Sequence, residues 1–431
     1  MDLTIEGKAF IDGSFQQSCI GIDNGRIVSI KKTLKADNHH TFGNKLILPG
    51  GIDIHVHFRD PGYTYKEDFQ TGSKSAIHGG ITCIFDMPNT IPQTTTKRNI
   101  IQKITIADKK SYTDFGIYAG LTANNLKYID ELCKYCNGFK IFLGNTTDSL
   151  MLPSNYLSDV FQKMRTINKP VLIHAEDETC LEKNRRPEYN LKDHLSCRPS
   201  SCEEQAIIHV LNKSSTYNIP IHICHLSSCE GFERLRYRRD NISVGTTPHH
   251  LFFDIDSIRL KETLYKVNPP IRSHFDKETL WHGITNRGID IIESDHAPHT
   301  FDEKNVDFDV APCGIPGVET MYPLFLAKVK QGALSMNNLI TLICERPAKI
   351  MNLPKGKIEI GKDADFIIVD YKNTTKITSE NLHSKCGWSP FEGFPAIFPS
   401  SVFIRGQQVI DDFELVEKPG VGTHVFVNNQ N

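Results

Sequence analysis

The stretch Gly50–His57, which reads Gly-Gly-Ile-Asp-Ile-His-Val-His, is the first of eight short apolar runs in the centre of the chain. Most of these runs are almost continuously apolar, as in strands that are buried on both faces of a parallel sheet. Segments with the helical spacing of apolar residues lie between them, such as 97–110 and 201–213. The other seven runs span residues 82–88, 114–121, 138–144, 169–177, 219–228, 241–250 and 288–299. Eight such alternations predict an α/β fold, a (β/α)8 barrel of the TIM type.

Both ends of the chain read as β-structure rather than as further β-α units. Near the N-terminus, residues 8–15 and 21–30 are strand-like and contain the hairpin signals Asp-Gly and Asn-Gly. Near the C-terminus, residues 356–370 and 401–410 have the same character. We therefore expect the two ends to pair into one small β-sandwich-like domain. The expected division is a β-domain of residues 1–48 and 346–431 beside a metal-dependent catalytic barrel of residues 49–345.

Composition excludes several classes of protein. The 431 residues carry 49 Lys and Arg against 51 Asp and Glu, a formal net charge of -2, which argues against a general nucleic-acid binder. Hydrophobic residues make up 39% and charged residues 23%, so the chain is neither disordered nor collagen-like. The N-terminus lacks a signal-peptide pattern, and the apolar runs fall short of the ~20 residues that span a bilayer. We expect a soluble, cytoplasmic protein whose 12 Cys are free thiols rather than a disulfide framework.

Polar residues stand at or near the C-terminal ends of five predicted strands. Active sites of such barrels lie at this face, so these side chains should meet at one mouth. His55 and His57 are two residues apart on a strand and therefore project from the same face. The whole set comprises His55, His57, Lys140, His174, His225 and Asp295. Neutral imidazoles with one carboxylate suit zinc and similar ions, and a catalytic site adds a water of lowered pKa.

Two metals at ~3.5–4 Å would need a bridging anion. Lys140 supplies one only after its neutral amine reacts with CO2 to form a carbamate, and a lowered pKa near cations makes that amine available. Taken singly, each of these residues also has a structural explanation, and only the joint pattern favours a metal site. We treat His39, His40, His274 and His282 as structural, His249 and His250 as candidates that support the ligands, and His222 as no ligand.

Two motifs carry a resemblance to a known family. They are Asp53–Gly62, Asp-Ile-His-Val-His-Phe-Arg-Asp-Pro-Gly, and Glu293–His299, Glu-Ser-Asp-His-Ala-Pro-His, with Lys304 five residues further on. Supporting matches are Met87–Thr90, His174–Glu176, His222–His225, Val267–Arg272 and Gly314–Thr320. From Ile27 to Val409 the chain resembles the dihydroorotases of the amidohydrolase superfamily.

The resemblance implies reversible hydrolysis of (S)-dihydroorotate to N-carbamoyl-L-aspartate, a step of de novo pyrimidine biosynthesis. It implies two Zn²⁺ ions per subunit, bridged by N6-carboxylated Lys140 and a hydroxide. His55, His57 and Asp295 would bind the more buried ion, and His174 and His225 the second. Some members of the family bridge with Asp, so Asp148 is the alternative to Lys140.

The resemblance also assigns the proton transfer and the substrate contacts. Asp295 would act as general base and then as general acid. Arg59, Asn89 and His299 would hold the substrate carboxylate, and Asn268 with the backbone near Cys313 and Gly314 would contact the ring amide. The segment 300–312 looks like an exposed loop that could close over the site.

Two other functions remain open on the residues alone. Allantoinases and hydantoinases share the scaffold, the His-x-His pair and the lysine, but a neutral ring does not explain Arg59 and His299. A non-catalytic homologue would be expected to lose metal ligands, whereas all six are present here. The expected partner is a small-molecule substrate, and the resemblance leaves open a homodimer and an association with a transcarbamoylase.

Overall fold

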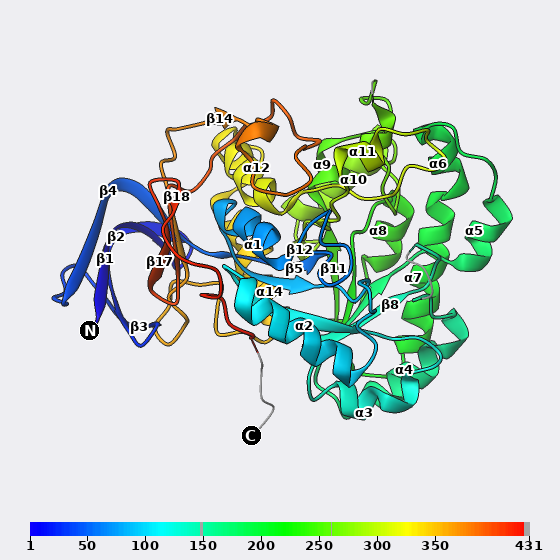
Figure 1. Cartoon of the computed structure of the whole chain (residues 1–431), viewed down its shortest axis with the longest axis horizontal. Coiled ribbons are helices and arrows are strands. Elements are labelled where there is room, and N and C mark those ends of the chain that lie inside the picture. The colour runs from blue at the N-terminus through cyan, green and yellow to red at the C-terminus, as the bar shows by residue number, and fades with distance from the viewer. Residues whose placement is uncertain (147–149, 260, 426–431) are drawn as a thin grey trace.

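The structure, a computed structural model, describes residues 1–146, 150–259 and 261–425. Eight parallel strands form the central sheet in the order of the sequence, and helices surround it (Figure 1). The strands are β5 (Gly51–Val56), β6 (Ile81–Asp86), β7 (Asp114–Gly120), β8 (Gly138–Phe142), β9 (Val171–His174), β10 (Ile221–Ile223), β11 (Ile242–Thr246) and β12 (Ile291–Ile292). The backbone N–H of His57 donates to the His296 carbonyl at 2.8 Å, so β5 meets the segment after β12. The predicted (β/α)8 barrel is confirmed.

The helices that cover the barrel follow the predicted spacing of apolar residues. The predicted helix 97–110 is α2, whose buried residues Ile100, Lys103 and Ala107 share one face, and 201–213 lies within α7. The main helices are α1 (Phe69–His78), α2 (Lys97–Lys110), α4 (Leu157–Met164), α7 (Ser200–Ser214), α8 (Cys229–Leu235), α10 (His274–Thr285) and α12 (Val318–Lys330). Shorter helices are α3 (Ile129–Leu132), α5 (Glu178–Asn184), α6 (Leu191–Cys197), α9 (Pro248–Phe252), α11 (Phe301–Lys304), α13 (Met336–Ile340) and α14 (Arg346–Ile350).

The two ends of the chain form a second eight-stranded sheet beside the barrel (Figure 1). Its strands, in spatial order, are β18 (Glu414–Leu415), β17 (Gln407–Asp411), β16 (Ser401–Ile404), β13 (Phe366–Val369), β4 (Asn38–Pro49), β1 (Leu3–Ile11), β2 (Ser14–Asp23) and β3 (Arg26–Lys31). The antiparallel pairing of β4 with β13 joins the N-terminal and C-terminal halves. A separate pair is formed by β14 (Thr375–Lys376) and β15 (Pro395–Ala396).

The predicted hairpins are present in this terminal sheet. Asp12-Gly13 and Asn24-Gly25 have φ values of 49° and 76°, and of 49° and 75°, which is the left-handed geometry that two-residue hairpins favour. Two backbone hydrogen bonds join the turns of this sheet to the residue Ala364, which precedes β13. Ala364 N–H donates to the Gly25 carbonyl in the β2–β3 turn at 2.9 Å, and Gly406 N–H in the β16–β17 turn donates to the Ala364 carbonyl at 2.8 Å. The sheet therefore curls over a small apolar core. The chain passes from β4 into β5 through Gly50 alone. The exact domain boundaries at residues 48 and 346 stay a prediction.

A buried lysine links the terminal sheet to the barrel. The Nζ of Lys355 lies 2.7 Å from Asp114, 2.7 Å from Asp365 and 3.0 Å from Asp363. Asp114 begins β7, and Asp365 immediately precedes β13. The lysine therefore ties the start of β7 to the segment that precedes β13, at the end of the barrel opposite the strand C-termini.

The prediction that all cysteines are free thiols is wrong for one pair. Cys180 and Cys202 form a disulfide with their Cα atoms 5.2 Å apart, and the other ten cysteines are free. The two segments meet because Asp177 N–H donates to the Cys202 carbonyl at 2.9 Å, which places α5 against the start of α7. Composition could not reveal this contact between helices.

Among the described residues, no helix is both long and apolar enough to cross a membrane.

Candidate metal centre

Three side chains from the first and last barrel strands converge at the strand C-termini. The Nε2 atoms of His55 and His57 lie 3.4 and 3.0 Å from Asp295 Oδ1. On the far side of each ring, His55 Nδ1 lies 3.2 Å from Glu293 Oε2, and His57 Nδ1 lies 2.6 Å from Asn89 Oδ1. Because both partners offer an oxygen acceptor, each Nδ1 carries the proton and each Nε2 presents a lone pair. This donor set fits a divalent metal ion, and the tautomers needed to bind one are already fixed.

A second pair of histidines lies beside the first group. His174 Nδ1, at the end of β9, is 3.0 Å from His225 Nε2, and the rings of His55 and His225 have centroids 5.2 Å apart. His174 Nε2 lies 2.7 Å from Glu176 Oε2, and Arg198 holds that carboxylate in turn. Because Glu176 accepts a hydrogen bond from Nε2–H, the other nitrogen of His174, Nδ1, presents a lone pair towards His225. The two nitrogens are close enough to bind one second ion.

Lys140 lies in β8 beneath these imidazoles and is fully buried. Its Nζ is 3.2 Å from Cys224 Sγ and 5.0 Å from the centroid of the Phe142 ring. A buried lysine amine that is neutral can react with CO2, and the carbamate that forms is an anion able to bridge two metal ions. The alternative bridge, Asp148, lies outside the described residues.

The charge states at this centre suit a cation. Burial, helped by the charge of Lys140, lowers the pKa of His55 to about 4. Burial likewise lowers the pKa of His174 and of His225, so all three rings are neutral near pH 7. The pKa of Asp295 is lowered although the group is buried, so Asp295 is a carboxylate. Neutral imidazoles and an ionised carboxylate are the protonation states that a metal ion requires.

A cavity of about 570 Å³ opens above the five histidine and aspartate ligands. Every residue that the sequence predicted for substrate binding lines it: Arg59, Asn89, Asn268, His299, Cys313 and Gly314. Lys140 lies below this lining. The structure therefore brings the predicted metal ligands and the predicted substrate contacts into one site.

A cationic group of side chains lies on one wall of the cavity. Arg59 is buried, its Nε donates to the Pro298 carbonyl at 3.2 Å, and its Nη2 lies 3.2 Å from His299 Nε2. Lys66 Nζ lies 3.1 Å from His299 Nδ1 and 2.8 Å from Glu303. Since an ammonium only donates, His299 Nδ1 accepts, and its Nε2 carries the proton, 3.1 Å from the Cys313 carbonyl. Burial lowers the pKa of His299 to about 3, so this ring is a neutral donor.

The sequence did not single out Lys66. It lies in the loop after β5, seven residues beyond Arg59, and lines the cavity together with Tyr63. Its position in the loop that follows the first strand, at the active face of the barrel, was the signal that could have found it.

The residues predicted to contact the ring amide differ in what they can offer. Asn268 Nδ2 donates to Thr146 Oγ1 at 3.2 Å, while its Oδ1 is buried and has no hydrogen-bond partner among the described residues. The Gly314 N–H already donates to the Lys266 carbonyl at 2.9 Å. Asn268 Oδ1 is therefore the group at this wall that is free to accept a hydrogen bond from a ligand N–H.

The segment 300–312 is only partly the exposed loop that the sequence predicted. Its outer residues Val306 and Val310 are exposed, but Thr300 caps the short helix α11, and Lys304 is fully buried. Lys304 Nζ donates to the carbonyls of Lys266, Pro312 and Gly314 at 3.2, 2.8 and 3.1 Å. These three bonds anchor the base of the segment against the cavity wall, so only its outer part could move.

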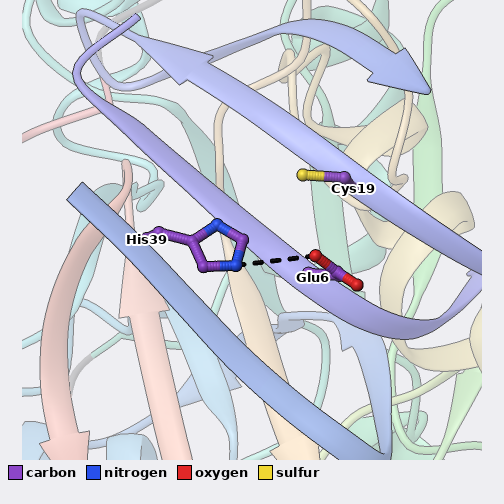
Figure 2. Close-up of side chains that lie close together, drawn as sticks. All are labelled: Glu6, Cys19 and His39. Atoms are coloured by element: carbon purple, nitrogen blue, oxygen red, sulfur yellow. Dashed lines mark ion pairs between the residues drawn. The ribbon is translucent and has the colours of Figure 1, made fainter. Parts of the chain in front are cut away.

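The assignment of the remaining histidines to roles outside the ligand set stays a prediction. His222 is held between Glu293 and Ser243, and His249 and His250 are buried after β11. Two further groups of potential ligands occur among the described residues. His55, Cys224 and Glu293 lie at the centre described above, and Glu6, Cys19 and His39 lie on the terminal sheet (Figure 2). There His39 Nδ1 is 2.7 Å from the Thr4 hydroxyl and Nε2 is 2.8 Å from the Thr41 hydroxyl. Both ring nitrogens therefore have partners in the sheet, which agrees with a structural role.

The barrel and its histidine and carboxylate centre define the class of protein. The chain belongs to the amidohydrolase family, whose model matches residues 46–428. It is similar to proteins named dihydroorotase in archaea. It is 37% identical over 435 residues to the Methanosarcina acetivorans protein, covering 96% of this chain and 93% of the relative. It is 38% identical over 419 residues to the Thermoplasma acidophilum protein, covering 97% of each.

A solved structure extends the likeness to the three-dimensional fold. The L-hydantoinase (dihydropyrimidinase) from Arthrobacter aurescens matches with a TM-score of 0.94 at 27% sequence identity, over 98% of this chain and 99% of that one. A structure of a D-hydantoinase matches with a TM-score of 0.91 at 25% identity. The arrangement of barrel and terminal sheet is thus shared with enzymes named for cyclic amides.

Proposed function

We propose that this protein is a dihydroorotase, which hydrolyses (S)-dihydroorotate reversibly to N-carbamoyl-L-aspartate in de novo pyrimidine biosynthesis. The observation that carries the proposal is a metal-ligand cluster at the base of a cavity whose wall holds the buried cation Arg59 beside His299. The substrate combines a cyclic amide, which the ligand cluster would hydrolyse, with a carboxylate, which needs a cation. The relatives named dihydroorotase support the same function.

We further propose two Zn²⁺ ions per subunit. His55, His57 and Asp295 would hold one, His174 and His225 the other, and N6-carboxylated Lys140 together with a hydroxide would bridge them. When bound, such ions polarise the ring carbonyl and supply a nucleophilic hydroxide near neutral pH. The convergence of the histidine nitrogens and the burial of Lys140 support this assignment.

Asp295 is placed to move the proton. It is ionised, and its Oδ1 lies at the centre of the ligand group, 3.0 Å from His57 Nε2. A carboxylate in that position accepts a proton as the nucleophile attacks and returns it to the amide nitrogen as the ring opens. In the biosynthetic direction the steps run backwards: the same carboxylate first takes the proton from the attacking nitrogen as a base and then, as an acid, gives it to the oxygen that leaves as the ring closes.

The wall opposite orients the ring. The guanidinium of Arg59 has five N–H donors, of which the Nε–H is used on Pro298, so the remainder can grip the substrate carboxylate with two parallel hydrogen bonds. The Nε2–H of the neutral His299 would turn to the substrate from the Cys313 carbonyl, which lies 3.1 Å away. Asn89 keeps its amide N–H groups, because only its Oδ1 is bonded to His57. Asn268 Oδ1 would accept from the ring N–H.

Replacement of Arg59 by Gln tests the carboxylate contact. We expect kcat/KM for dihydroorotate to fall about 100-fold, from the loss of ~3 kcal/mol of charge-assisted hydrogen bonds. Steady-state kinetics with zinc analysis of the same sample measures this. The matched control Arg234→Gln removes an exposed guanidinium that pairs with Glu204 on the barrel exterior and should leave both values unchanged. An unchanged kcat/KM for Arg59→Gln, with zinc retained, would remove Arg59 from substrate binding.

A purified-enzyme assay against dihydroorotate, allantoin and hydantoin tests the function itself. We expect turnover of dihydroorotate, and formation of dihydroorotate from N-carbamoyl-L-aspartate at lower pH. The high TM-score to hydantoinases makes a hydantoinase the second candidate. Turnover of hydantoin or allantoin without turnover of dihydroorotate would replace the proposal with that candidate, and a folded chain that takes up no zinc would indicate a non-catalytic homologue.

The resemblance to dihydroorotases is also the support for a cytoplasmic location. A homodimer, or a complex with a transcarbamoylase, is a further option that light scattering of the purified chain, alone and mixed with the transcarbamoylase, would decide.

A further inference from the structure

A buried carboxylate lies beneath the metal centre and contacts both halves of it. Glu293 follows β12 directly and is 0% exposed. Its Oε2 lies 3.2 Å from His55 Nδ1 and 3.3 Å from His222 Nε2. Its Oε1 accepts the backbone N–H of His225 at 2.6 Å. One side chain thus holds a predicted ligand of the first ion and a predicted ligand of the second.

The contact to His55 fixes the state of that ring. Glu293 Oε1 accepts the backbone N–H of His225, and Oε2 lies within hydrogen-bond distance of two imidazole nitrogens, which are the contacts that a carboxylate makes. A carboxylate only accepts hydrogen bonds, so His55 must carry its proton on Nδ1. His55 Nε2 is then left with a lone pair, directed at the space beside Asp295 Oδ1.

The contact to His225 fixes a backbone that is otherwise unfavourable. His225 has φ = 38°, in the left-handed region that carries an energetic cost for a residue with a Cβ. The charge-assisted bond from its N–H to Glu293 Oε1 offsets that cost. With this backbone held, His225 Nε2 lies 3.0 Å from His174 Nδ1. If the backbone relaxed, His225 Nε2 would move away from His174 Nδ1.

Gly245, in β11, leaves the space that the Glu293 carboxylate occupies. A Cβ built on Gly245, in β11, would lie 2.5 Å from Glu293 Oε1 and 3.0 Å from His222 Nε2. Glycine at 245 is therefore the residue that allows Glu293 to reach His225 N–H. The position of the carboxylate is set by three strands, β5, β10 and β11, as well as by its own.

We propose that Glu293 is a positioning residue that couples the two metal positions, fixing the tautomer of His55 with one oxygen and the backbone of His225 with the other. This inference rests on the proposed metal-dependent function. It differs from a merely structural role because it requires the affinity for both ions to depend on one side chain that binds neither.

Glu293→Gln is the direct test, because the amide keeps the shape of the carboxylate. The amide has one acceptor and one donor, so it cannot accept from His55 and His222 on one side and from His225 N–H on the other. We expect the affinity for both zinc equivalents to fall about 10–100-fold, the usual effect of removing a group that orients metal ligands. Competition with a chromophoric chelator, on metal-free protein reloaded with zinc alone, measures both equivalents without any substrate.

Glu319→Gln is the matched control. Glu319 is also a buried carboxylate that accepts from a histidine ring, His383 Nδ1 at 2.7 Å, and from a backbone N–H, that of His383 at 2.8 Å. It does not line the catalytic cavity. We expect this variant to change the melting temperature of the metal-free protein while leaving both zinc affinities at the wild-type values.

A second variant keeps the test valid if Glu293→Gln fails to fold. Gly245→Ala leaves the carboxylate in place but pushes against its Oε1, and should weaken zinc binding in the same way. Unchanged affinity for both equivalents in the folded variants, or weakening of one equivalent alone, would overturn the coupling. A wild-type chain that binds no zinc would instead refute the proposed function, and this is seen before any variant is made.

Discussion

Replacement of Asp295 by Asn is expected to lower kcat for dihydroorotate by at least about 1,000-fold, which lies within the range of general acid-base catalysis. The side chain keeps its shape, but an amide can neither accept the proton from the nucleophile nor return it to the leaving nitrogen. The Asn variant also presents an N–H or an uncharged oxygen where Oδ1 now lies 3.0 Å from His57 Nε2. Steady-state rates at saturating substrate, in both directions, measure the effect.

Zinc analysis separates the two contributions of Asp295. Asp290→Asn is the control. Asp290 lies just before β12, whereas Asp295 lies after it, and the Asp290 carboxylate pairs with Arg238 and Arg346. This variant should cost stability and leave kcat unchanged. If Asp295→Asn retains its zinc and also retains the wild-type kcat, the proton transfer must be assigned to another group.

The barrel strands were predictable because each is buried on both faces and is therefore apolar almost throughout. Their ends were not. The run 288–299 reads as one long strand, but β12 is only Ile291–Ile292, because the chain turns at Asp295, which has φ = 44°. Similarly, 356–370 contributes only Phe366–Val369, since Lys355 and its three aspartates hold the preceding segment at the base of the barrel.

The meeting of the candidate ligands was predictable for a related reason. Parallel strands bring their C-terminal ends to one face whatever the loops do, so His55, His174 and His225 meet as the strand order dictates. The groups that orient these ligands could not be predicted in this way. Glu293 and His55 are 238 residues apart, and the contact of Glu176 with Arg198 depends on the path of the loop between them. Neither contact leaves a periodic signal in the sequence.

The overall charge of the chain could not predict the substrate, because it contains no information about local geometry. A net charge of -2 gives no sign of an anionic substrate. Arg59 and Lys66 are concentrated on one cavity wall, where the low dielectric of a buried site strengthens their attraction for a carboxylate. Local geometry, rather than overall composition, therefore decides which substrate the cavity can hold.

Lys140→Ala is expected to lose most activity, at least about 100-fold, together with much of the second zinc equivalent. The reason is that Ala can form no carbamate, so the proposed bridge between the two ion positions is missing. The buried side chain vacates a space beside Cys224 and Phe142, which a small carboxylic acid could enter. Acetate or propionate, added at high concentration, should therefore restore part of the activity and of the bound zinc.

The rescue distinguishes a bridging anion from a lysine that only fills space. Acetamide has nearly the same shape as acetate but no charge, so it should restore neither zinc nor turnover if Lys140 acts as a carbamate. Asp295→Asn serves as the second control, because acetate cannot replace a carboxylate that must also transfer a proton. The opposite pattern, with Lys140→Ala as active as the wild type and Asp148→Ala inactive, would transfer the bridge to Asp148 and remove Lys140 from the metal centre.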